Sequence, residues 1–194
     1  IEEKGVKLKL TEQEQLLLQP ILEQCQQTPQ LKVMVCPGSN WLNKQLSKET
    51  LKSFLQYFAK SLNAHFLFLW GHPAEKAIAE ELAVSLPGQS SVIDKLSLSA
   101  LQNLMAQVDL VLAMDSLPLH LAGTTSTPTY SVFGASSANK YKPGGKTHGA
   151  FQGSCPYGQQ FEKRCRQLRT CKTGACIRSL EGRSLFDHFL AWWS

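Results

Sequence analysis

The chain has 194 residues, 43% of them hydrophobic, which is enough to bury one full core, with or without a sizeable appendage. Its 20 lysine and arginine residues outnumber 15 aspartate and glutamate residues, and the formal net charge is +5 at pH 7. No apolar run approaches the roughly 18 to 20 residues that span a bilayer, and no signal peptide opens the chain. The sequence therefore excludes a helix-anchored membrane protein and predicts a soluble, cytoplasmic one.

Residues 1–10 carry many charges and little patterning, and the chain begins with Ile1 rather than with methionine. We therefore expect a fragment or a processed product, in which residues 1–10 are a linker from a missing N-terminal domain. Thr11 followed by Glu14 fits a capping box, which predicts that the first helix begins directly after this linker.

From residue 11 to residue 134, short apolar runs of strand length alternate with stretches of helical length. The apolar residues between Leu51 and Leu62, for example, recur on one face of a helix. This alternation is typical of βαβ units, which form a parallel sheet with helices on both faces, so we expect a three-layer α/β domain over 11–134. The expected helices are 12–26, 47–63, 74–86, 99–107 and 184–193, with a short helical turn from Pro118, and the expected strands are 31–36, 65–70, 92–93, 110–114 and 129–133.

The periodic pattern ends after Gly134. Residues 135–183 are rich in glycine, lysine, arginine and cysteine, and we expect a basic, irregular, Cys-rich segment packed on the same domain. A C-terminal helix in residues 184–194 then closes the chain. The basic residues are compatible with contacts to phosphates, acidic lipid or nucleic acid, or with a solvated surface.

The six cysteines fall into two groups. Cys25 and Cys36 lie in an apolar helix and an apolar strand, so we expect buried thiols. The other four follow the spacing C-x9-C-x5-C-x4-C in the basic segment, which is compatible with a structural zinc ion, with free thiols or with disulfides. These four candidate metal ligands are Cys155, Cys165, Cys171 and Cys176.

Two loops that follow predicted strands carry candidate binding residues. In CPGSNWLNK, Ser39 offers a hydrogen-bonding group, and Lys44 has a side chain long enough to reach phosphate oxygens. In GHPAEK, the carboxylate of Glu75 suits the two hydroxyls of a ribose. Taken alone, each loop also fits a structural interpretation, with a solvated lysine and a helix-capping glutamate.

The third loop, MDSLPLHLAG, is the most informative because Pro118 favours a helix start beside several polar groups. Asp115 and Ser116 directly follow a buried strand, and His120 lies on the first helical turn. A histidine there either donates to a phosphate or packs as a structural residue among the leucines.

In this order, the three loops and the segment TPTYSVFG resemble the C-terminal half of glycosyltransferase family 9, the lipopolysaccharide heptosyltransferases. The resemblance runs from about Leu8 to Ile177. It implies one Rossmann-like half of a GT-B type enzyme, the half that binds the nucleotide-sugar donor ADP-heptose. It also implies an inverting transfer without a cofactor, whose catalytic base belongs to the N-terminal domain.

The resemblance assigns a role to each loop. It implies that Lys44 contacts the donor phosphate, that Glu75 holds the ribose and that Asp115 contacts the sugar. The residues implied to hold the diphosphate are Ser116, Leu117 and His120. The chain departs from the family where Leu117 replaces a glycine and where Ala135 replaces the proline of an FGPT-like segment.

Together, the sequence patterns and the resemblance predict that the chain is the donor-binding domain of a glycosyltransferase in lipopolysaccharide core synthesis. They also predict that this domain is inactive on its own. Its partners would be a nucleotide-diphosphate sugar and, through the missing domain, a lipopolysaccharide or other glycolipid acceptor, with no nucleic acid. The basic segment is compatible with peripheral contact to the anionic inner membrane. Two alternatives stay open: a non-catalytic nucleotide or nucleic-acid binding module with a Cys-rich basic tail, and a family member that has lost its donor site.

Overall fold

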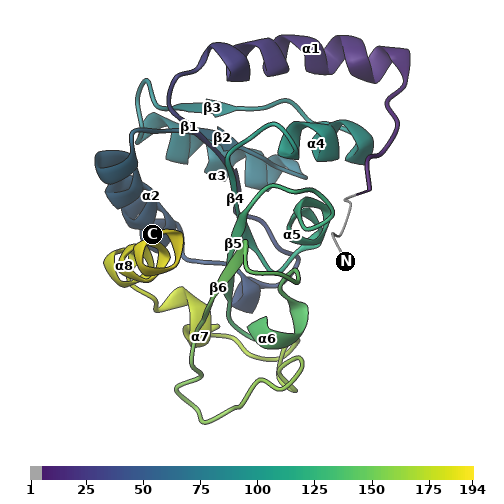
Figure 1. The fold of residues 1–194 in the computed structure, drawn as a ribbon. Helices are drawn as coiled ribbons and strands as arrows, with labels where there is room; N and C mark the ends of the chain where they lie inside the picture. Colours follow the sequence, from purple (N-terminus) through teal and green to yellow (C-terminus); the bar gives the residue numbers. More distant parts are fainter. Residues whose placement is uncertain (1–5) are drawn as a thin grey trace.

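Six parallel strands form one sheet in the order β3-β2-β1-β4-β5-β6. Figure 1 shows this sheet between the helices, with β3 near its upper end and β6 near its lower end. This computed structural model describes residues 6–194, so the first half of the expected linker, residues 1–5, lies outside the described residues. The strands are β1 (Leu31–Cys36), β2 (Ala64–Phe68), β3 (Ser90–Val92), β4 (Leu110–Met114), β5 (Thr129–Phe133) and β6 (His148–Gln152). The order is that of dinucleotide-binding α/β folds, which confirms the expected Rossmann-like parallel sheet.

The larger helices and α5 lie close to where the sequence predicts them, whereas η1, α6 and α7 were not predicted. The larger ones are α1 (Glu12–Gln27), α2 (Lys48–Leu62), α3 (Pro73–Val84), α4 (Leu98–Met105) and α8 (Gly182–Trp193). The shorter ones are η1 (Leu42–Lys44), α5 (Leu117–Ala122), α6 (Ala138–Tyr141) and α7 (Ala175–Arg178). The capping box of Thr11 and Glu14 is present at the start of α1, and Pro20 lies inside this helix.

Both faces of the sheet are buried because alternate residues of each central strand enter opposite halves of the core. On β1, Val33 and Val35 pack with α2, α3 and α8, whereas Met34 and Cys36 pack with α1, α4 and α5. The two layers of helices on either side of the sheet are visible in Figure 1. Because the central strands are buried on both faces, their sequences are mostly apolar and do not alternate between apolar and polar residues.

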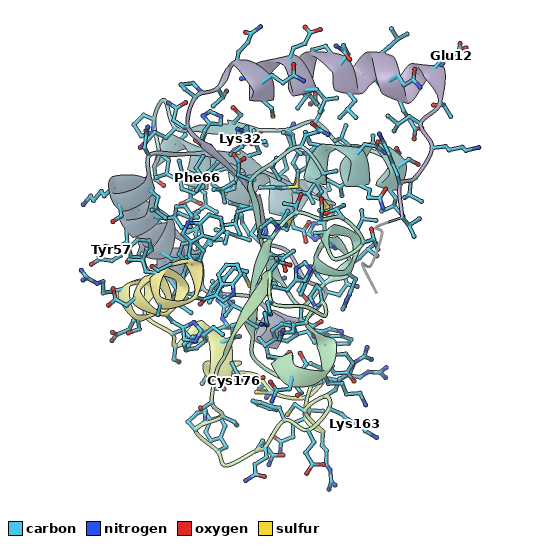
Figure 2. All side chains as sticks on the ribbon, viewed as in Figure 1. Glu12, Lys32, Tyr57, Phe66, Lys163 and Cys176 are labelled. Atoms are coloured by element: carbon cyan, nitrogen blue, oxygen red, sulfur yellow. The ribbon has the colours of Figure 1, made fainter. Side chains whose placement is uncertain are left out.

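An aromatic cluster joins α2 to the C-terminal helix α8. The ring centroid of Phe58 lies 4.8 Å from the ring centroid of Phe189 and 5.7 Å from that of Phe66. Phe54 and Phe186 complete the contact between the two helices. Phe66 points from the sheet into this layer in Figure 2, where Lys163 lies far from it on the outer part of the Cys-rich segment.

The expectation that residues 135–183 are irregular throughout needs correction. Residues 148–152 form β6, which extends the sheet by pairing with β5 from Thr129↔His148 to Phe133↔Gln152. The segment HGAFQ escaped the sequence analysis because it is short and contains no β-branched residue. The helices α6 and α7 also fall within 135–183, so the domain continues past residue 134. We call residues 153–181, which are irregular apart from α7, the Cys-rich lobe.

No helix in residues 6–194 is long and apolar enough to cross a membrane.

Phe58→Ala should lower the free energy of unfolding by about 3–5 kcal/mol, because the ring is fully buried and its removal leaves a cavity. Urea denaturation followed by circular dichroism measures the change. Val84→Ala, at a side chain that is 81% exposed, should alter it by less than about 0.5 kcal/mol. Equal losses in the two variants would contradict the described core.

Candidate functional site

A cavity of about 630 Å³ opens beyond the carboxyl ends of β1, β2 and β4. This is the point where the strand order reverses, since the chain moves from β1 towards β3 and then crosses back to β4 on the other side of β1. The loops after the three strands supply most of the lining. All seven binding residues expected from the sequence line this cavity: Ser39, Lys44, Glu75, Asp115, Ser116, Leu117 and His120.

The charged end of the cavity is built around Asp115. Its Oδ2 accepts hydrogen bonds from Lys44 Nζ at 2.5 Å and from Ser136 Oγ at 2.5 Å. Lys44 and Asp115 are 7% and 8% exposed, and Ser136 is fully buried. A buried carboxylate with two such donors is held in one orientation, and the charge of Lys44 is matched before any ligand enters.

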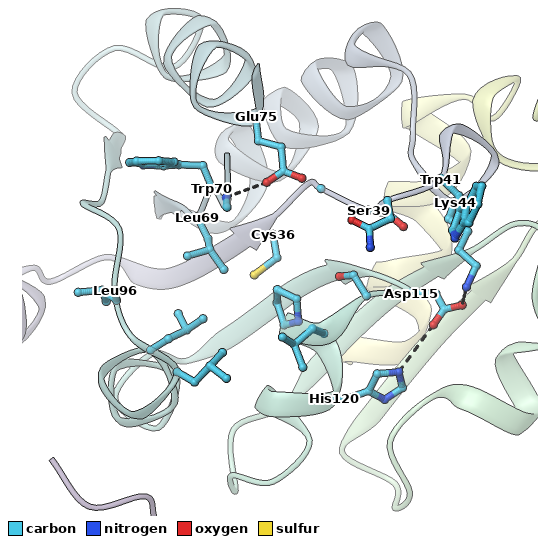
Figure 3. Close-up of a pocket in the computed structure, with 18 of the residues that line it drawn as sticks. Cys36, Ser39, Trp41, Lys44, Leu69, Trp70, Glu75, Leu96, Asp115 and His120 are labelled. Carbon is cyan, nitrogen blue, oxygen red and sulfur yellow. Dashed lines mark hydrogen bonds and ion pairs between the residues drawn. The ribbon is translucent and has the colours of Figure 1, made fainter. Parts of the chain in front are cut away.

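His120 lies at the open side of the same carboxylate. Its Nε2 is 3.7 Å from Asp115 Oδ1, and half of its side chain is exposed (Figure 3). The exposed part of the ring therefore faces the cavity, where it can form a hydrogen bond to a ligand. Ser116 donates to the carbonyl oxygen of Met114 at 3.3 Å, and Leu117 is 60% exposed at the cavity wall.

Glu75 comes from the start of α3 and reaches back to the loop that precedes it. Gly71 N–H donates to its Oε2 at 2.7 Å, and His72 Nε2 lies 3.3 Å from its Oε1. A Cβ at Gly38 would lie 2.1 Å from Glu75 Oε1, so any larger residue at position 38 would displace this carboxylate from its present position. The close packing sets Glu75 in the middle of the cavity, between its two ends, as Figure 3 shows.

The other end of the cavity is apolar. Trp70 is fixed there because its Nε1 donates to the carbonyl oxygen of Ile93 at 2.8 Å, while Lys76 Nζ lies 5.2 Å from the ring centroid. The thiol of Cys36 is buried below this end, and burial together with the charge of Glu75 raises its pKa, so it stays protonated. Four leucines also line the cavity: Leu69, Leu96, Leu98 and Leu101.

Several lining residues were not expected from the sequence. Trp41 stands in the first loop, and Trp70 stands directly before the second, so the positions of those loops after strands could have identified both. Lys95 comes from the loop before α4, and Arg164 comes from the Cys-rich lobe. No periodic pattern indicated that the lobe returns to the carboxyl edge of the sheet.

The lobe supports the turn that carries Lys44. Asn43 Nδ2 donates to the carbonyl oxygen of Leu168 at 2.9 Å, and Asn43 O accepts from the N–H of Ala135 at 3.2 Å. A Cβ at Gly174 would lie 2.9 Å from the Cα of Asn43, and Gly174 has a φ of +57° that favours glycine. The lobe and η1 are therefore packed as one body.

The expected burial of Cys25 and Cys36 is confirmed, at 4% and 2% exposed. In the lobe, burial raises the pKa of Cys176 to about 11, with further contributions from the charges of Cys155, Cys171 and Cys165. Cys155 and Cys165 also pack against the core cluster that contains Cys176. Hydrogen bonding from Gly174 N–H, with Sγ as acceptor at 3.4 Å, lowers the pKa of Cys171.

These thiols do not converge as ligands. Within residues 6–194, no three histidine, cysteine, aspartate or glutamate side chains are placed to hold one metal ion together. The donor set suits zinc or another soft metal in kind, but the positions of the thiols in this structure do not.

The fold and the cavity define a Rossmann-like α/β domain with an open cavity at its switch point. The model of glycosyltransferase family 9 (heptosyltransferase) matches residues 3–170, and the chain belongs to this family. The comparison with curated proteins gave no significant match.

Solved structures share this fold. The E. coli heptosyltransferase WaaC with ADP is 18% identical, with a TM-score of 0.68, over 90% of this chain and 48% of that one. A family 9 glycosyltransferase from Veillonella parvula is 15% identical, with a TM-score of 0.75, over 96% and 53%. E. coli ADP-heptose lps heptosyltransferase II is 13% identical, with a TM-score of 0.66, over 96% and 53%. The chain thus spans about half the length of these structures.

Lys44→Met and Asp115→Asn should each destabilise the protein by about 3–5 kcal/mol, because each leaves the other charge buried without its partner. The double variant should lose clearly less than the sum of the two. A double-mutant cycle of urea denaturation measures the coupling. Lys48→Met, in the exposed pair with Glu81, is the control and should change stability far less. Additive losses at Lys44 and Asp115 would contradict a coupled pair.

Proposed function

We propose that this domain binds the nucleoside diphosphate part of a nucleotide sugar as the donor site of a glycosyltransferase. The observation that carries the proposal is the order of groups along the cavity. An apolar end lined by Trp70 and several leucines is followed by Glu75, and then by the charged end around Asp115 (Figure 3). A base, a ribose and a diphosphate require these environments in this sequence.

Each part of such a ligand has a matching group. The base would lie against Trp70 and the leucines, and the ribose hydroxyls would donate to the Glu75 carboxylate. The diphosphate and sugar would lie near Lys44, Asp115 and His120. When the bond to the sugar breaks, negative charge grows on the departing diphosphate, and fixed positive groups beside it lower the barrier.

The nucleotide is proposed to be adenosine diphosphate, and the donor ADP-heptose. The family description and the ADP bound to the E. coli WaaC structure support this choice. The pair of Lys44 and Asp115 also refines the role expected for the lysine, because Lys44 would approach a phosphate while it remains bonded to the carboxylate.

The rest of the reaction is proposed to need groups outside this chain. A base for the acceptor hydroxyl and the acceptor site would come from a second domain, since the structural neighbours are about twice as long. The acceptor would be a lipopolysaccharide precursor or another glycolipid, reached at the anionic cytoplasmic surface of the inner membrane. The basic side chains of the Cys-rich lobe would favour such a surface electrostatically.

Calorimetry with ADP tests the donor site. The chain should bind ADP, and Glu75→Ala should weaken the affinity about tenfold to hundredfold through the loss of hydrogen bonds to a charged group. Glu80→Ala is the matched control, because Glu80 lies on the same helix but outside the cavity. The affinity of this variant for ADP should equal that of the wild type.

A transfer assay with ADP-heptose and a lipopolysaccharide acceptor should give no turnover by this chain alone. Robust turnover would contradict the proposed division between two domains. Failure to bind ADP, together with steep salt dependence of binding to a mixed oligonucleotide, would instead favour a nucleic-acid binding module.

We also propose that the four lobe thiols hold a structural zinc ion. Thiolates are preferred zinc ligands, and the four cysteines lie within residues 155–176; they would have to move together to bind the metal. Metal analysis of freshly purified, reduced protein should find one zinc per chain, and Cys171→Ser should lower this content. Absence of zinc in the reduced protein would exclude the proposal.

A further inference from the structure

Among the binding residues expected from the sequence, the only lysine at the charged end is Lys44, and it is already paired with Asp115. Asp115 accepts a hydrogen bond from Lys44, so the positive charge of this lysine is already paired with a carboxylate, and His120 faces the same carboxylate. Glu75 adds a second negative charge to the lining. A diphosphate that entered this end would need a further positive group, because its charge is costly to bury unpaired.

Arg164 is placed to supply that group. It lines the cavity, and no carboxylate of the described residues lies within ion-pair distance of it. Its guanidinium carbon lies 5.7 Å from the ring centroid of Tyr141, which supports the side chain from one side. The guanidinium therefore keeps its hydrogen-bond donors for a ligand.

The backbone of Arg164 is held firmly although it belongs to an irregular segment. Ser137 N–H donates to the carbonyl oxygen of Lys163 at 2.8 Å, and Cys165 N–H donates to that of Ala135 at 2.8 Å. These bonds flank an antiparallel bridge between Arg164 and Ser136. Since Ser136 also donates to Asp115, the position of Arg164 is tied to the carboxylate at the centre of the charged end.

Lys95 is the other cation in the lining without a carboxylate partner among the described residues. It precedes Leu96, which lies at the apolar end in Figure 3, away from Asp115 and His120. A single ammonium group also lacks the planar pair of donors that matches two phosphate oxygens. Arg164 is the better candidate on both grounds.

We propose that Arg164 binds the diphosphate of the nucleotide-sugar donor through its guanidinium group and so fixes how deeply the diphosphate enters the charged end. This inference rests on the proposed donor site and adds to it a residue from the Cys-rich lobe. The lobe thereby contributes directly to the ligand as well as supporting η1.

Titration calorimetry of the chain with ADP and with adenosine tests the proposal. Arg164→Ala should weaken ADP binding about tenfold or more and leave adenosine binding within about twofold, because the nucleoside has no phosphate for the guanidinium. Arg164→Lys keeps the charge but loses the paired donors, and its ADP affinity should fall between those of the wild type and the alanine variant.

Arg166→Ala is the matched control. It removes the same charge from the same lobe at a residue outside the cavity, and its ADP affinity should stay within about twofold of the wild type. Melting temperatures of the variants separate binding from folding. A role in folding alone would weaken ADP and adenosine equally and lower the melting temperature.

The outcomes distinguish the two proposals. If the wild type binds ADP and Arg164→Ala binds it equally well, or loses ADP and adenosine binding in parallel, the assignment of Arg164 is overturned and the donor site stands. If the wild type does not bind ADP, the donor site itself is overturned and the assignment of Arg164 with it.

Discussion

The carboxylate of Asp115 is the group on which the rest of the site depends. It follows β4, and it accepts from Lys44 after β1 and from Ser136 after β5. Three loops that are distant in sequence are therefore joined by one buried acceptor. Because a buried charge is stable only with its partners in place, the fold of each of these loops constrains the other two.

The same arrangement connects the site to the Cys-rich lobe. Ser136 lies beside Arg164 in the lobe, and Asn43 beside Lys44 donates to Leu168. The lobe has little regular structure of its own, yet it packs on two of the loops that position Asp115. Its conformation and that of the charged end are therefore parts of one hydrogen-bonded unit.

Much of this could be predicted from the sequence because the central strands are short, fully buried runs. The positions of β1, β4 and β5 follow from their apolar residues, and the loops after β1 and β4 place Lys44 and Asp115 at the same edge of a parallel sheet. The local rules of capping also hold, as Thr11 shows. Such features depend on residues that are neighbours in the chain.

What the sequence could not provide depends on contacts between distant residues. β6 has no strand pattern of its own and exists because β5 offers an edge. Likewise, no local signal brings Arg164 to the cavity, since its place results from a bridge to Ser136. The pairing of Lys44 with Asp115 is another such contact, and it changes what a lysine in that loop is able to do.

The packing of α8 against α2 also bears on how the chain reaches its native state during synthesis. Phe58 and Phe54 emerge from the ribosome long before Phe186 and Phe189, which cover them in the finished protein. Until α8 has been synthesised, the aromatic side chains of α2 on this side of the sheet are exposed to water. Contacts between residues so far apart in sequence form late in folding. The stage of synthesis at which α2 exists without α8 is therefore one at which the nascent chain is prone to aggregation.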